Sequence, residues 1–281
     1  MKKIALIGGL LLSSLIARSQ SLDAFLDEAD TFFKAQVVNG RVDYAGLDKK
    51  GSSLNSLVKQ IAEFDTKSLS DIERKAFFIN AYNISVINGI IDNYPTESPL
   101  KVNGFFDGIE HNIAGTKMTL NTLEKENLLK VTGDEKLHFV LVCAAISCPP
   151  IATFAYRPES LERQIEGRTR LALNNADFIQ VDDRNKTVKI SEIFKWYAGD
   201  FAKSPSIIDY LNEYRFESIP TDYKTDYYTY DWNLNGQSPK KDAEPTSNLQ
   251  NFTPSVLLNK GQVELNSFYN IFGSFVIVIN F

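Results

Sequence analysis

The stretch that decides the fold is SDIERKAFFINAYNISVINGII, which runs from Ser70 to Ile91. Ser70 can cap a helix, Glu73 completes a capping box, and Tyr94-Pro95 is placed to end the helix. Apolar side chains cover most of the circumference of this predicted helix, which is typical of a helix packed on all sides. We therefore expect the rest of the domain to be built around it.

Asparagines interrupt this apolar helix, and two of them share a face. Asn80 and Asn83 lie three residues apart, a spacing that places both side chains on the same side of a helix. A buried amide without partners costs roughly 1–3 kcal/mol. The two amides either tie neighbouring loops to the helix or line a pocket, and the sequence leaves both interpretations open.

A second stretch, KLHFVLVCAAISCPP from Lys136 to Pro150, contains both cysteines of the chain and one of its two histidines. The β-branched and aromatic run after His138 predicts a buried strand, which the Ser-Cys-Pro-Pro turn would end. In an unbroken strand, His138 and Cys143 would face opposite sides. This parity favours Cys148, in the turn, as the thiol better placed for chemistry.

The two cysteines, Cys143 and Cys148, lie five positions apart. A short loop in an oxidising compartment favours a disulfide between them, whereas a partner elsewhere in the fold would favour a free thiol. The spacing does not decide between these two states. The chain has too few Cys and His residues for a four-ligand zinc site without carboxylates.

The remaining periodicity predicts an α+β fold, with N-terminal helices packed on a mostly antiparallel sheet built from hairpins with interleaved short helices. Further helices are expected over residues 21–34, 54–64, 119–129, 158–173 and 206–214. Hairpins are expected over residues 37–47, 104–120 and 178–190, and a last strand over residues 223–231.

The ends of the chain differ from its middle in composition. Residues 1–19 resemble a signal peptide, with two lysines, an apolar run and a small-x-small cleavage site. A single α+β domain is expected over residues 21–235, followed by a polar linker over 236–255. The β-prone tail, residues 256–281, either docks as an edge strand or opens a longer β-rich region.

The leader predicts an exported protein, periplasmic or extracellular, with no stable transmembrane helix once it is cleaved. Loss of Lys2, Lys3 and Arg18 would change the net charge from −5 to −8. An acidic chain without a basic run is a poor partner for nucleic acid or an anionic membrane. The expected partner is an unknown ligand or an envelope protein, and the sequence indicates no cofactor.

Four motifs carry a resemblance to a known family: KAFFINAYN at 75–83, LHFVLVCAAISCPP at 137–150, IFKWYAGDF at 193–201 and YDWNLN at 230–235. Together they resemble an exported bacterial member of the domain-of-unknown-function family 547, DUF547. The resemblance implies an α+β domain, found in bacteria and plants, without an established activity. The family pattern matches Asn80, Asn83, Glu124, His138, Cys143 and Cys148.

The chain also departs from that family pattern at three positions. Phe78 stands where tryptophan is usual, and Ala144 stands where glycine is common after the first cysteine. Lys125 replaces a histidine that often follows the glutamate. The last difference weakens any mechanism that needs a second histidine beside Glu124.

The favoured function is a non-catalytic binding or interaction domain of the cell envelope, with a Cys143–Cys148 disulfide and His138 hydrogen-bonded in the core. Asn80, Asn83, Asp231 and Trp196 are the candidate pocket residues. Whether the protein is an enzyme stays open.

Two catalytic alternatives remain. The first is a hydrolase or acyltransferase of the papain or transglutaminase type, with a cysteine nucleophile and His138 as the base. Asn83, Glu124 or Asp231 would orient the imidazole in that scheme. The second is a metal-dependent hydrolase using His138 with Glu124 or other carboxylates, although two ligands are too few to name a metal.

Overall fold

A computed structural model of the protein describes residues 21–47 and 52–237. The chain divides into two compact units, residues 1–239 and 240–281, and every described residue belongs to the first. The predicted leader, the β-prone tail and all of the predicted linker except Gly236 and Gln237 lie outside the described residues.

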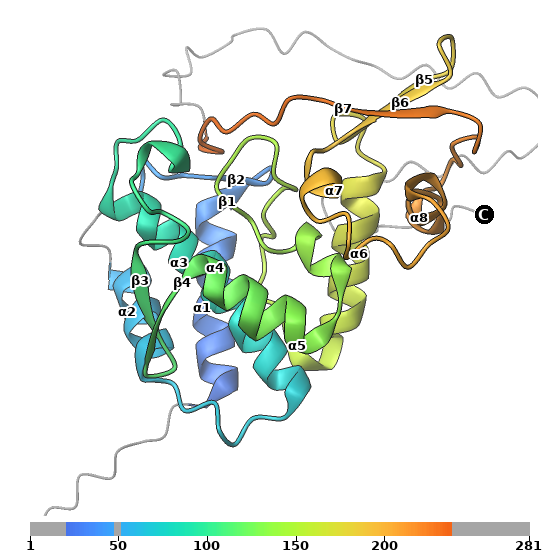
Figure 1. Ribbon diagram of the computed structural model, residues 1–281. Helices are drawn as coiled ribbons and strands as arrows, with labels where there is room; N and C mark the ends of the chain where they lie inside the picture. The colour runs from blue at the N-terminus through green and yellow to red at the C-terminus, as the bar shows by residue number, and fades with distance from the viewer. Residues whose placement is uncertain (1–20, 48–51, 238–281) are drawn as a thin grey trace, which may run out of the picture. The chain divides into compact units, whose positions relative to one another are not determined.

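Helices provide most of the regular structure (Figure 1). The α-helices are α1 (Leu22–Gln36), α2 (Ser52–Glu63), α3 (Asp71–Asp92), α4 (Leu120–Thr122), α5 (Lys130–Thr132), α6 (Leu161–Leu173), α7 (Ile193–Trp196) and α8 (Ile207–Tyr214). The π-helical segment η2 (Leu123–Leu129) joins α4 to α5, and short 3-10 helices form η1 (Pro99–Lys101), η3 (Glu135–Phe139) and η4 (Pro158–Ser160).

Helix α3 is the centre of the core, as its sequence predicts. It begins after Ser70, whose backbone N–H and hydroxyl both donate to the Glu73 carboxylate, at 2.8 and 2.6 Å. Fifteen of its 22 residues are buried, and α1, α2, η2 and η4 all contact it. Among the described residues, no helix is both long and apolar enough to cross a bilayer.

The strands form three small sheets, which confirms the α+β class. They are β1 (Val37–Val38), β2 (Arg41–Val42), β3 (Glu110–Ile113), β4 (Thr116–Thr119), β5 (Ile179–Asp182), β6 (Thr187–Ile190) and β7 (Lys224–Tyr227). Each expected hairpin is an antiparallel pair, β1-β2, β3-β4 or β5-β6, and β7 adds to β6 in parallel. Within the described residues these hairpins stay separate instead of joining into the one sheet that was expected.

The strand expected after His138 is absent, which corrects the sequence prediction. Residues 135–139 form η3, and the chain then runs without a strand to Pro150. The side chains from Leu137 to Val142 are nevertheless buried, as the apolar pattern requires. Apolar composition reports burial, whereas a strand also needs a neighbouring backbone to pair with. The parity argument that separated His138 from Cys143 therefore does not apply.

The backbone of this irregular segment pairs with the amides of α3 instead. Asn83 Nδ2 donates to the carbonyl of Val140 at 2.9 Å, and its Oδ1 accepts from the N–H of Val142 at 3.0 Å. Asn80 bonds to both backbone groups of Tyr156 in the same way, at 2.8 and 3.0 Å. Of the two interpretations of these buried amides, the contacts match the one in which they tie loops to the helix.

The last described residues, 230–237, pass back over the domain and are called here the closing segment. The N–H of Asn235 donates to the carbonyl of Ala144 at 2.9 Å, and its own carbonyl accepts from the N–H of Val42 at 3.3 Å. Its side chain accepts a hydrogen bond from the buried hydroxyl of Tyr44 at 2.9 Å. The closing segment thus joins the first hairpin to the cysteine loop.

We expect Asn83→Ala to lower the free energy of unfolding by about 3 kcal/mol, because it leaves two buried backbone groups without a partner. Asn88→Ala is the matched control, since Asn88 lies on the same helix and bonds to the exposed Asp92. The control should change stability by no more than about 0.5 kcal/mol. Urea denaturation followed by circular dichroism measures both. Equal losses of stability in the two variants would mean that the hydrogen bonds of Asn83 make no specific contribution to folding.

Candidate functional site

A cavity of about 440 Å³ collects side chains from distant parts of the chain. Its wall is formed by α3, η2 and η3, by the loop that follows η1, by the cysteine loop, by α7 and by the closing segment. The lining residues are Tyr82, Pro99, Leu100, Val102, Asn103, Gly104, Phe105, Phe106, Asp107, Asn121, Glu124, His138, Leu141, Cys143, Cys148, Ile193, Trp196, Tyr197, Tyr230 and Trp232. A cavity of this size can hold a small organic molecule.

Glu124 is a buried carboxylate in the cavity wall, and two tyrosines hold it in place. The hydroxyl of Tyr82 donates to its Oε2 at 3.1 Å, and the hydroxyl of Tyr197 donates to its Oε1 at 2.9 Å. Burial, together with this carboxylate, raises the pKa of both tyrosines above the usual range. Both hydroxyls therefore remain protonated donors at neutral pH, and the carboxylate keeps further acceptor capacity.

Glu124 also sits on an unusual turn of helix. The sequence predicted a helix here, and the helix is present, but η2 has π-helical hydrogen bonding. π-Helical segments are rare in proteins, and those that occur often lie at functional sites.

His138 forms a polar pair with Asp200, a residue that the sequence analysis did not single out. The distance between His138 Nε2 and Asp200 Oδ2 is 2.7 Å. The imidazole is almost fully buried, at 3% side-chain exposure, whereas the Asp200 side chain is 43% exposed. The ring also packs on Tyr197, with centroids 4.0 Å apart. A carboxylate bonded to one imidazole nitrogen fixes the orientation of the ring.

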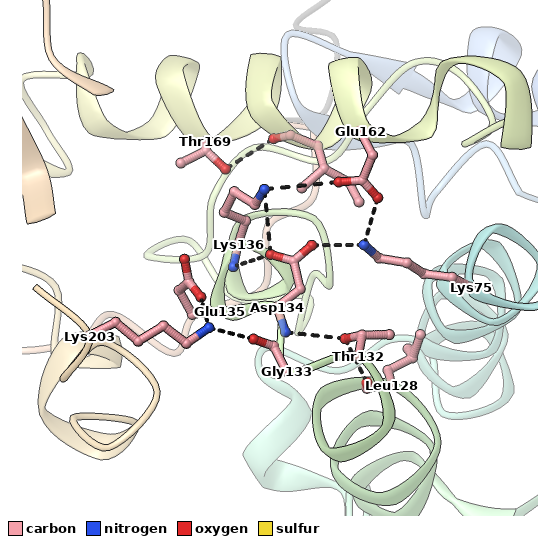
Figure 2. Close-up of polar contacts among 11 residues, drawn as sticks. Lys75, Leu128, Thr132, Gly133, Asp134, Glu135, Lys136, Glu162, Thr169 and Lys203 are labelled. Carbon is pink, nitrogen blue, oxygen red and sulfur yellow. Dashed lines mark hydrogen bonds and ion pairs between the residues drawn. The ribbon is translucent and has the colours of Figure 1, made fainter. Parts of the chain in front are cut away.

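An ion-pair network anchors the segment that leads into His138 (Figure 2). Lys75 of α3 reaches Asp134 at 2.7 Å and Glu162 of α6 at 2.9 Å, and its side chain is only 11% exposed. Burial lowers the pKa of Lys75, but the two hydrogen-bonded carboxylates outweigh it and raise the pKa above its usual value. Asp134 also accepts from the N–H of Lys136 at 3.1 Å, which caps η3. The network therefore sets where η3 begins.

Cys143 and Cys148 form a disulfide, with Cα atoms 6.3 Å apart, so the bonded state is the one described. The hydroxyl of Tyr230 lies 3.2 Å from one sulfur and 3.1 Å from the other. Within the loop, Ala144 has a φ of +61°. Glycine adopts this left-handed conformation without strain, which gives a physical reason for a pattern with glycine at this position.

An aromatic group forms one side of the cavity. Trp196 and Trp232 are stacked, with centroids 5.8 Å apart and planes 24° apart, and Tyr230 lies 4.9 and 4.8 Å from them. We call these three residues the aromatic triad. The indole of Trp196 is 45% exposed, so the triad combines a buried phenol with a solvent-facing ring. Burial raises the pKa of the Tyr230 hydroxyl, which stays protonated beside the disulfide.

The structure brings together five of the residues that the sequence indicated, namely Glu124, His138, Cys143, Cys148 and Trp196. Three other candidates do not line the cavity. Asn80 and Asn83 bond to loop backbone, and the carboxylate of Asp231 accepts from the N–H of Asn233. The imidazole partner is Asp200, in place of Asn83, Glu124 or Asp231.

Sequence reasoning missed most of the remaining polar and aromatic wall. The missed wall residues that lie within the four motifs are Tyr82, Tyr197, Tyr230 and Trp232. Asp200, the partner of His138, also lies within a motif, and that position was the only signal available for all five. Among residues 21–47 and 52–237, no group of three or more His, Cys, Asp or Glu side chains is arranged to hold a metal ion.

Residues 66–171 match the model of the family described as "Protein of unknown function, DUF547". The chain contains a DUF547 domain. No curated protein and no solved structure matches the chain. The matched part of the DUF547 domain holds α3, Glu124, His138 and the disulfide. The motifs at 193–201 and 230–235, which supply Asp200 and the aromatic triad, lie beyond it.

We expect the unreduced protein to show no free thiol, because both cysteines are bonded to each other. Alkylation under denaturing, non-reducing conditions followed by mass measurement should leave the mass unchanged, and prior reduction should add two labels. Replacing both cysteines by serine should lower the free energy of unfolding by about 2 kcal/mol, as expected for so short a loop. Two alkylated cysteines without reduction would contradict the disulfide.

Proposed function

We propose that the DUF547 domain is a binding domain of the cell envelope whose ligand occupies the aromatic cavity. The observation that carries this proposal is the cavity itself, where side chains from all four sequence motifs meet around one space of about 440 Å³. Ligand sites are typically concave, largely apolar and provided with a few placed polar groups. The leader-like N-terminus and the disulfide support an exported location.

The buried polar groups of the cavity support binding. Two tyrosine hydroxyls hold Glu124, and a hydrogen bond to Asp200 holds the buried imidazole of His138, before any ligand arrives. Groups held in this way lose little freedom when a ligand binds. The bonded cysteines have no thiolate that could act as a nucleophile, so the state described is suited to recognition.

A fragment screen by ligand-observed NMR on the unreduced protein tests this proposal. We expect some fragments to bind, and their affinity should fall about tenfold in Trp232→Ala, which removes one aromatic ring from the cavity wall. Phe216→Ala is the matched control, because Phe216 is 82% exposed and does not line the cavity. Hits that bind both variants equally, or no hits at all, would contradict a ligand site here.

A second candidate function is a thiol hydrolase or acyltransferase that acts after the disulfide is reduced. The observation that favours it is the His138–Asp200 pair at 2.7 Å, in a cavity that both cysteines also line. An imidazole oriented by a carboxylate can take the proton of a nearby thiol, which gives the reactive thiolate. In this scheme Asp200 is the orienting residue, and either sulfur is a candidate nucleophile.

The reactivity of the reduced protein tests this second candidate. We expect iodoacetamide to alkylate one cysteine at pH 7 about tenfold faster than it alkylates glutathione, because an imidazolium lowers the pKa of a thiol. His138→Gln and Asp200→Asn should each remove this advantage, while Lys189→Gln, a change at an exposed lysine of β6 outside the cavity, should leave it. Wild-type alkylation no faster than that of glutathione would exclude an activated thiol.

A further inference from the structure

The charged groups of the cavity wall have one sign. Among the described residues, its lining includes the carboxylates of Glu124 and Asp107 but no lysine and no arginine. An anionic ligand would leave its hydration shell without gaining a cationic partner, which is unfavourable. The cavity is therefore suited to a ligand that is neutral or positively charged.

The aromatic triad further restricts the chemical class of ligand that suits the cavity. The faces of Trp and Tyr rings attract a cation through their negative π-density, and Trp attracts it most strongly. Trp196, Tyr230 and Trp232 lie together on one side of the cavity, and Phe106 contacts Trp232 at a centroid distance of 6.2 Å. Ring faces offer no strong acceptor to an N–H donor, so they suit an ammonium group that carries alkyl substituents.

We propose that the cavity binds a small organic cation with an alkylated ammonium group, held against the aromatic triad with Glu124 and Asp107 supplying the negative charge. This inference rests on the proposed function and names the ligand class of that site. An alkylated ammonium occurs both in free cations and in zwitterionic lipid headgroups. The wall favours the free cation, because the phosphate of a headgroup would meet no lysine or arginine among the lining residues that the structure describes.

Choline and 3,3-dimethylbutan-1-ol form the decisive pair of probes, because they share a shape and differ in charge. Isothermal titration of the unreduced protein should give choline a Kd at least about tenfold lower than that of the neutral alcohol. Phosphocholine should bind more weakly than choline. Equal binding of choline and the alcohol would overturn the proposal, and phosphocholine binding as tightly as choline would overturn the preference for a free cation.

Glu124→Gln should weaken choline binding about tenfold and leave binding of the neutral alcohol unchanged. Glu126→Gln is the matched control, since Glu126 lies on the same helical segment, is exposed and pairs with Lys130 outside the cavity. Asp107→Asn provides a second carboxylate variant at an exposed position, should Glu124→Gln fail to fold. If Glu126→Gln lost choline affinity and Glu124→Gln did not, the assignment of the negative charge to Glu124 would be wrong.

Tryptophan fluorescence quenching tests the charge of the cavity on the wild-type protein, so it does not depend on whether a variant folds. The chain has only two tryptophans, and both line the cavity, so its tryptophan fluorescence reports on this site alone. The ratio of quenching by caesium to quenching by iodide should be higher for the protein than for free N-acetyltryptophanamide, because an acidic wall attracts the cation and repels the anion. Stronger quenching by iodide would overturn the proposal.

The two proposals fail separately. If neutral fragments bind and respond to Trp232→Ala while choline does not bind, the cationic ligand class is wrong and the binding domain stands. If no compound of any charge binds in the cavity, the proposed function itself is wrong.

Discussion

Two asparagines on α3 support the arrangement on which the site depends. Asn80 holds both backbone groups of Tyr156, and Asn83 holds the carbonyl of Val140 and the N–H of Val142, each in an irregular segment. These segments contain buried backbone that no strand pairs with, and unpaired backbone of this kind is strongly unfavourable. The amides thus take the place of a neighbouring strand and allow a loop to run through the core beside the helix.

The cavity depends on the irregular conformation of that loop, because its side chains need not alternate between two faces. A strand would send alternate side chains to opposite faces, whereas the segment from His138 to Cys148 directs its imidazole and both sulfurs to one space. The Lys75–Asp134 pair fixes the beginning of this segment, and the disulfide fixes its end. Between these anchors, Asn83 holds the middle against α3.

Periodicity predicted the elements that depend on local pattern. The start of α3 after Ser70 and the β1-β2 hairpin follow from their sequences. The turn of this hairpin is Asn39-Gly40, a pair typical of tight hairpin turns, and its two residues have positive φ, at +52° and +71°. The apolar run after His138 predicted burial correctly and backbone conformation wrongly, because the partner of that backbone is a side chain. Asp200 could not be paired with His138 from sequence, since 62 positions separate them and no local rule joins them.

The closing segment also bears on the order in which the domain is assembled. Asn235 bonds to Tyr44 across a sequence separation of 191 residues, and Trp232 and Tyr230 of the same segment form part of the cavity wall. Contacts between such distant positions form late, because closing a long loop costs entropy before the contact can stabilise it. During synthesis from the N-terminus, the core around α3 can pack early. The wall that carries Trp232 is completed only after residue 235 has emerged from the ribosome, so the cavity is one of the last features to become native.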